Sequence, residues 1–413
     1  MGWVPQLLTE PRFHFTYPGF HWIAPLREGA MYGVFFVMAL SAICISLGLL
    51  VRSAALLFFL TFTYVELIDK TTYLNHYYFV SLVAFLLIFI PCDKAFALGK
   101  ARCGQAGAAS SEGPEVPRLH YLVFRTQVGM VYFFAGFAKL NADWLLRAEP
   151  LGTWLRARAE TVSWFSEPSV AYVMSWAGAA FDLSVPFLLA TRRSRPYAYA
   201  AVVCFHVATW LLFPIGVFPW LMIAAATVFF EPNWPEMWRQ KLASSFNLRS
   251  RFVTERGPST QAPVSGWSVA FFSVFLAVQA VLPLRYLAHG GSVNWHEQGF
   301  RFAWRVMLVE KSGLVEYEVV TKDGRRFREY PRRELTALQY RMLSTQPDMI
   351  VDYARELGAR YERRGEGKVR VFAYSRAALN RRASQTLVRP DVDLMSDLEG
   401  KAWIEAFVEP SPR

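Results

Sequence analysis

Long apolar runs separated by short polar stretches occupy the first two thirds of the chain. A membrane helix needs about 20 apolar residues, and each run reaches or approaches that length. The pattern therefore predicts an α-helical polytopic membrane bundle of about eight hydrophobic helices. The runs cover residues 29–51, 54–69, 75–91, 119–139, 169–190, 196–213, 217–230 and 266–287. Because several runs are short, we expect some helices to be tilted, re-entrant or covered by their neighbours.

The pattern changes near residue 289, where apolar and polar positions begin to alternate. The stretch LVEYEVVTKDGRRFREY alternates on both sides of Asp323 and Gly324, which predicts a β-hairpin, and KVRVFAYS predicts a further strand. The stretch RRELTALQYRMLSTQPDMIVDYARELGARYERR between them has helical spacing. We therefore divide the chain into a membrane-embedded domain, residues 1–288, and a soluble mixed, β-containing C-terminal domain, residues 289–413.

Composition and charge agree with a multi-pass membrane protein. Hydrophobic residues make up 54% of the 413 residues, and the mean hydropathy is +0.20. The net charge of +11 lies largely in loops between the apolar runs, so it indicates orientation in a membrane and no nucleic-acid partner. The more positive set of alternate loops is assigned to the cytoplasm, which places the C-terminal domain outside it. Residues 103–117 predict a loop and residues 250–265 a polar linker.

The cysteines point to neither a disulfide framework nor a metal site. All four lie in or beside the apolar part, so a disulfide-built module is excluded from the C-terminal domain. Neither a CxxC pair nor a CxxCH sequence occurs, which leaves zinc ribbons and c-type haem without support. We therefore expect no metal.

Several polar residues interrupt the apolar runs, although ionisable groups at membrane depth are costly. Such groups usually meet one another around a wet or ligand-filled cavity. The alternative to a cavity is a purely structural role for these residues. Glu66 or Asp182 would then pair with Arg125, and the histidines would serve packing. Two histidines on different helices could also hold a haem, but nothing else in the sequence supports one. The group comprises Glu66, Asp69, Lys70, Asn75, His76, Arg125, Gln127, Asp182 and His206.

Lys139 lies where an apolar run ends. A primary amine at the edge of a low-dielectric core loses the solvation of its charged form, which can make it a usable base near neutral pH. The alternative is a lysine that extends its charge to the membrane interface.

Ordered motifs along the chain resemble the vitamin K-dependent γ-glutamyl carboxylase family, in the form of a bacterial-type homologue with an HTTM domain. The matching segments are KTTYLNHYY at 70–78, YFFAGFAKLNADWL at 132–145, FDLSVPFLL at 181–189, FH at 205–206, IGVFPWLMIA at 215–224 and NWHEQGFRFAWRVML at 294–308. Arg125 and Gln127 precede Lys139, as the corresponding residues do in that family. One departure is Thr209, which stands near the place where carboxylating members carry an asparagine.

The resemblance implies a membrane enzyme whose lysine, here Lys139, deprotonates reduced vitamin K. The hydroquinone anion of phylloquinone or menaquinone then reacts with O₂ to give a strong base, which becomes the epoxide as it removes a γ-proton from a glutamate. Removal of the γ-proton leaves a carbanion. The family histidine that matches His76 serves the step in which this carbanion captures CO₂. Asn75, Arg125, Gln127, Asp182 and His206 are the supporting cavity residues.

The resemblance also implies the partners: membrane lipid, an isoprenoid quinone that enters from it, and a glutamate-containing peptide or protein brought by the C-terminal domain. Phe300, Phe302 and Trp304 at the junction are substrate-side candidates, with simple packing as the alternative. A quinone epoxidase without carboxylation, and a non-enzymatic membrane protein that binds quinone or lipid, remain the competing functions.

Overall fold

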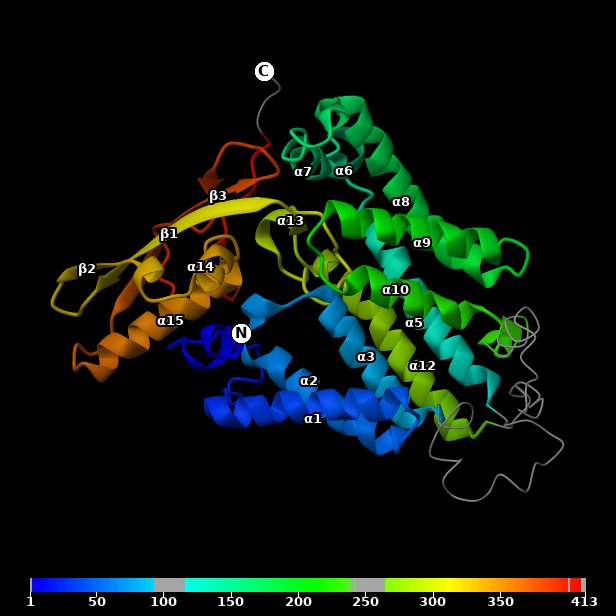
Figure 1. Ribbon diagram of the computed structural model, residues 1–413. Helices are drawn as coiled ribbons and strands as arrows, with labels where there is room; N and C mark the ends of the chain where they lie inside the picture. Colours follow the sequence, from blue (N-terminus) through cyan, green and yellow to red (C-terminus); the bar gives the residue numbers. More distant parts are fainter. Residues whose placement is uncertain are drawn as a thin grey trace.

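The computed structural model describes residues 2–92, 116–235, 237–238, 241, 264–399 and 402–409. Residues 103–115 and 250–263, most of the predicted loop and linker, lie outside this part of the chain. A helical bundle and a smaller sheet with its own helices lie side by side (Figure 1).

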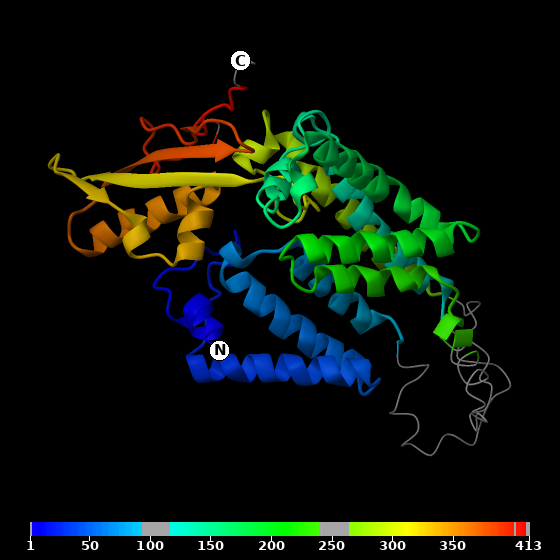
Figure 2. The ribbon, with the colours of Figure 1, turned by 45° about the horizontal axis from the view of Figure 1, so that its top comes forward.

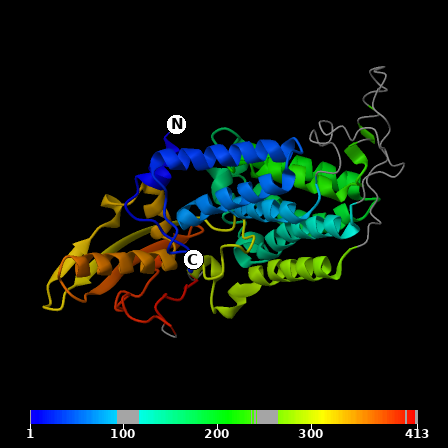
Figure 3. The ribbon, with the colours of Figure 1, turned by 90° about the horizontal axis from the view of Figure 1, so that it is seen from below.

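Helices occupy each of the eight apolar runs, and the long ones lie next to one another in the view from below (Figure 3). Four helical segments of the described chain are long and apolar enough to cross a membrane: α1, α2, α8 and α12 continued by η6. Eight membrane crossings are therefore not confirmed. The main helices are α1 (Glu28–Ser46), α2 (Val51–Ile68), α3 (Asn75–Phe89), α5 (Arg118–Ala138), α8 (Pro168–Ala190), α9 (Arg195–Leu212), α10 (Phe218–Ala226) and α12 (Gly266–Val281).

Short helical turns connect the long helices and continue into the C-terminal part. They are η1 (Pro5–Thr9), η2 (Lys70–Thr72), α6 (Ala142–Leu146), α7 (Leu151–Arg156), η4 (Ser163–Ser166), η5 (Thr227–Phe229), η6 (Leu282–Ala288), α13 (Val293–His296) and η7 (Pro331–Arg333). Many large apolar side chains of the bundle point outward, among them Phe36 of α1, which is 69% exposed. Lipid is the environment in which such a surface is stable.

The C-terminal sheet is antiparallel with the strand order β2-β1-β3-β4. Its strands are β1 (Lys311–Val320), β2 (Arg326–Glu329), β3 (Arg370–Leu379) and β4 (Gln385–Thr386). The predicted hairpin is confirmed, since β1 pairs with β2 and Gly324 adopts the left-handed backbone of the turn, with φ of +84°. The strand predicted from KVRVFAYS is confirmed as β3.

The stretch with helical spacing forms two helices, which cover one face of the sheet (Figure 2). Helix α14 (Ala337–Leu343) begins with a capping box between Thr336 and Gln339. Helix α15 (Pro347–Arg363) starts with a proline, which fits the first turn of a helix but cannot continue one. The apolar side of α15 enters the same core as the inward residues of β1 and β3.

The N-terminal segment joins the two parts of the molecule. Phe15, fully buried, belongs to the core of the sheet domain, and its carbonyl accepts a hydrogen bond from the Lys70 backbone N–H at 2.7 Å. The Lys70 Nζ pairs with Asp348 at 2.9 Å and Asp352 at 2.5 Å, both on α15. These contacts hold the segment before His76 against the sheet domain.

Candidate functional site

A close approach of α5 and α8 brings the first two polar groups of the site together. A Cβ on Gly136 would lie 2.8 Å from the backbone nitrogen of Leu183, so only glycine permits this contact without a shift. Lys139 follows one turn after Gly136, at the C-cap of α5, and Asp182 precedes Leu183 on α8. The glycine therefore determines how near the amine and the carboxylate can come.

Lys139 and Asp182 form a buried ion pair. The Lys139 Nζ donates to Asp182 Oδ2 at 2.6 Å, and the side chains are 7% and 6% exposed. The Nζ also lies 5.2 Å from the ring centre of Trp144. Lys139 therefore does not extend its charge into solvent, and removing one partner would leave the other buried and uncompensated.

The ion pair lies in the wall of a mostly apolar chamber of about 360 Å³. A second polar pair lines the same chamber: Tyr132 of α5 and His206 of α9, whose hydroxyl oxygen and Nε2 lie 2.8 Å apart. Tyr132 precedes Lys139 by seven residues, or two turns, so both side chains share one face of α5. The chamber thus presents two polar pairs to whatever occupies it.

His76 is not among the residues that line this chamber. Its ring packs against Phe218 of α10, with ring centres 5.6 Å apart, and Phe218 also contacts His206, with ring centres 6.0 Å apart. Phe218 does line the chamber. Phe218 thus connects His76 to the wall of the chamber that contains Lys139.

Asn75 connects the start of α3 to the junction segment. Its Nδ2 donates to the Arg305 carbonyl at 3.2 Å, and its Oδ1 accepts from the Tyr73 hydroxyl at 3.0 Å. That hydroxyl accepts from the Phe302 backbone N–H at 2.7 Å. The network positions the backbone just before His76 relative to residues 302–305.

Arg125 and Gln127 lie away from the chamber. Arg125 precedes Lys139 by 14 residues of helix, which is about 21 Å along the axis. Arg125 donates to the carbonyls of Val228 and Phe230 at 2.9 and 3.0 Å. It therefore pairs with neither Glu66 nor Asp182. Glu66 instead accepts from Ser81 at 2.5 Å. Gln127 is fully buried, and its amide atoms have no hydrogen-bond partner in the described structure.

The junction aromatics Phe300, Phe302 and Trp304 do not line the chamber. Phe302 packs within 5.7 Å of the rings of Tyr17, Tyr73 and Tyr78, and the buried Trp304 stacks on Tyr78 at 5.1 Å. Phe300 is half-buried in the preceding turn. Val306 and Met307, the next residues along this segment, do line the chamber.

An anchor outside the bundle holds the segment that follows Lys139. Asp143 of α6 accepts from Asn380 at 2.8 Å and from both terminal nitrogens of Arg382, at the end of β3. Burial opposes ionisation of this carboxyl, but the hydrogen bonds from Arg382 and Asn380 outweigh it and lower the pKa of Asp143. The sheet domain is thereby tied to the backbone four residues from Lys139.

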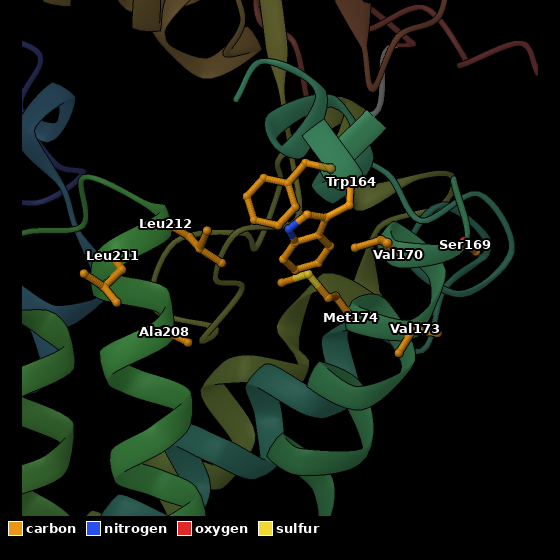
Figure 4. Close-up of a pocket in the computed structure, with 9 residues that line it drawn as sticks. Trp164, Ser169, Val170, Val173, Met174, Ala208, Leu211 and Leu212 are labelled. Atoms are coloured by element: carbon orange, nitrogen blue, oxygen red, sulfur yellow. The ribbon is translucent and has the colours of Figure 1, made fainter. Parts of the chain in front are cut away.

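An open apolar groove of about 610 Å³ adjoins the chamber between α8 and α9 (Figure 4). Trp164 and Phe165 of η4 are among its lining residues. Met174, Ala208 and Leu212 line both the groove and the chamber, so the two spaces share a wall.

Sequence reasoning missed Tyr132, Trp144, Phe218, Val306 and Met307 as parts of this site. The spacing of Tyr132 and Lys139 on one helix face was the available signal for the first of them. The others are apolar residues, whose sequence pattern is that of ordinary packing. Among the described residues, no group of three His, Cys, Asp or Glu side chains is placed to hold a metal ion.

Comparison with known families gives two matches that together span most of the chain. Residues 1–234 match the family model of the HTTM domain, and residues 264–409 match that of the vitamin K-dependent gamma-carboxylase, lumenal domain. No solved structure matches the chain.

Proposed function

Because the chain belongs to the vitamin K-dependent gamma-carboxylase family, with the HTTM and lumenal domains both present, we propose that it oxidises a reduced naphthoquinone with O₂ and couples this to carboxylation of glutamate. It is a membrane protein whose C-terminal domain is extracytoplasmic. The observation that carries the proposal is the Lys139–Asp182 pair in the wall of an apolar chamber.

Lys139 is the proposed base for a quinol hydroxyl. The pair shares one proton; when that proton lies on the Asp182 carboxylate at 2.6 Å, Lys139 is a neutral amine that can accept the quinol proton. The Tyr132–His206 pair supplies further hydrogen-bonding groups in the same chamber. When bound, the reduced quinone supplies the electrons and, with O₂, the strong base for the γ-proton of glutamate.

The size and polarity of the two adjoining spaces support a quinone with an isoprenoid tail. The chamber of about 360 Å³ lies within the range of small-molecule sites and combines apolar walls with two polar pairs. The groove of about 610 Å³ is lined by apolar side chains apart from Ser169. An aromatic head group in the chamber could therefore extend its tail along α8 and α9 toward lipid.

Exclusion of water also favours this chemistry. Lys139, Asp182 and His206 are each less than a tenth exposed. A carbanion in bulk water would be protonated before it met CO₂, so a buried site protects the carboxylation step. We assign His76 to CO₂ capture; its ring contacts Phe218, which lines the Lys139 chamber.

The test is an assay that scores the two half-reactions separately. The purified full chain in lipid is loaded anaerobically with reduced vitamin K or menaquinone and then given O₂, labelled bicarbonate and a glutamate peptide. Epoxide together with label fixed in the peptide is the expected result. Epoxide without fixed label would indicate an epoxidase alone, and tight binding with unchanged quinone would indicate a non-enzymatic quinone-binding protein.

A further inference from the structure

Arg305 is a buried cation without a carboxylate partner among the described residues. In the described parts of the chain, Lys70, Lys139, Arg195 and Arg305 are the buried lysines and arginines. The first three pair with Asp348 and Asp352, with Asp182 and with Glu231, respectively. Arg305 is 7% exposed and forms no ion pair with a described residue. Burial of an uncompensated guanidinium is costly. A bound anion would explain why Arg305 is buried without an ion-pair partner among these residues.

The contacts of Arg305 leave part of its donor set unused. Its Nη1 reaches Asn294 Oδ1 at the long distance of 3.4 Å, and the guanidinium lies 4.3 Å from the ring centre of Tyr286. Its Nε is buried without a hydrogen-bond partner among the described residues. A carboxylate oxygen is the strongest acceptor that could satisfy this N–H.

His296 supplies a second buried N–H without a partner among the described residues, and it lies on the same short helix, α13, as Asn294, which contacts Arg305. Its Nδ1 accepts from the Gln298 backbone N–H at 3.0 Å, so a neutral ring carries its proton on Nε2. Burial first, and then the charges of His289, Lys311 and Arg305, lower the pKa of His296 to about 4, so the ring is neutral at pH 7. The Nε2 is buried without a hydrogen-bond partner in the same described region, and the residue is 7% exposed.

Arg305 and His296 lie close in sequence to residues that line the Lys139 chamber, but they do not line it themselves. The Arg305 carbonyl accepts from Asn75, next to His76, and Val306 and Met307 line the Lys139 chamber. The Arg305 side chain instead contacts Asn294 and Tyr286, and it does not line the chamber. An anion held there is therefore beside the reacting group, not the group itself.

We propose that the Nε of Arg305 and the Nε2 of His296 bind a carboxylate of the substrate peptide, on an acidic residue that flanks the glutamate to be carboxylated. The assignment of the peptide as substrate rests on the proposed function. Arg305 and His296 are then specificity determinants, which select peptides with neighbouring acidic residues.

Two peptides test this selection. Each contains one glutamate, flanked in one peptide by aspartate and in the other by asparagine, which has the same shape without the charge. Binding of the fluorescently labelled peptides to the full chain in lipid nanodiscs is measured by anisotropy, and KM is measured in the carboxylation assay. We expect the wild type to prefer the aspartate peptide by roughly 10- to 100-fold, the range for a hydrogen-bonded charge.

Variants separate the site from a general effect on folding. Arg305→Gln should abolish the preference, Arg305→Lys should keep part of it, and His296→Phe should weaken it while retaining a ring. Arg326→Gln, an exposed arginine of β2, is the matched control and should leave the preference unchanged. Thermal unfolding identifies any variant that fails to fold.

The outcomes distinguish this inference from the proposed function. Equal binding of both peptides to the wild type, or an unchanged preference in both Arg305→Gln and His296→Phe, would overturn the carboxylate site. Selective binding with no label fixed in either peptide would support the site and contradict the carboxylation reaction.

Discussion

The Nζ of Lys139 lies 2.6 Å from the carboxylate of Asp182, 43 residues later in the chain, where α5 and α8 pack most closely. Two consequences follow for a lysine proposed as a base. The carboxylate stabilises the ammonium form, so Lys139 is a free base only when the shared proton lies on Asp182, and each group depends on the other for compensation of its charge.

Replacement of Lys139 and of His76 should separate the two half-reactions. Lys139→Ala should abolish epoxide formation, a loss on the order of 10²- to 10⁴-fold for a general base. His76→Ala should spare epoxide formation and lose carboxylation. Epoxide and fixed label are measured in the same reaction, with the exposed Lys322→Ala as a control. Normal epoxidation by the Lys139 variant would contradict the proposed mechanism.

Asp182→Asn should destabilise the bundle and slow epoxidation, because it leaves the Lys139 ammonium buried without its counter-charge. The expected cost is about 3–5 kcal/mol, the usual effect of breaking a buried pair. The double variant Lys139→Met with Asp182→Leu should recover most of the stability but none of the activity. Thermal unfolding in detergent and the epoxide assay measure the two effects, and equal stability of Asp182→Asn and wild type would argue against a functional ion pair.

Tyr132→Phe tests the second polar pair of the chamber. Loss of the hydroxyl leaves the buried Nε2 of His206 without its partner at 2.8 Å, at a cost of about 1–3 kcal/mol. We expect slower epoxidation, with the apolar shape of the chamber preserved. Single-turnover epoxide formation at saturating quinone measures this, and an unchanged rate would limit Tyr132 to packing.

Gly136→Ala should displace α8 from α5, because the added Cβ would lie 2.8 Å from the Leu183 backbone nitrogen. Overpacking of this kind costs about 1–3 kcal/mol and should lengthen the Lys139–Asp182 contact. Gly129→Ala on the same helix is the matched control, since its Cβ would meet Pro186 at an ordinary 3.5 Å. Equal melting temperatures and epoxidation rates for the two variants would show that the close contact is unimportant.

The Asp143 anchor should make stability depend on pH in the acid range. The pKa of Asp143 is lowered below its ordinary value of 3.8, so the anchor contributes fully above about pH 4 and is lost as the pH falls through the lower, folded-state pKa. Melting temperatures measured from pH 7 down to pH 3 should fall less steeply for Asp143→Asn than for the wild type. Asp391→Asn removes an exposed pair with Arg389 and should change the slope little, because solvent screens that pair.

Local sequence pattern predicted the parts of this molecule that depend on neighbours along the chain. Apolar runs became helices, and the turn at Asp323 and Gly324 became a hairpin because glycine accepts the positive φ that the turn needs. The helical spacing predicted after the hairpin is confirmed, and the structure divides the stretch into α14 and α15, with Pro347 beginning the second helix. Four of the predicted spans are long and apolar enough to cross a membrane.

Taken alone, the sequence determined the family, the helical and sheet-containing parts, and Lys139 and His76 as the residues of interest. Only the tertiary structure decided that Asp182 partners Lys139, that Tyr132 meets His206, that Arg125 lies elsewhere, and that Val306 and Met307 reach the chamber. The physical reason is that periodicity reports which side of an element is buried, whereas the partner across a contact depends on how closely two elements approach. At Gly136 that distance depends on the absence of one side-chain carbon.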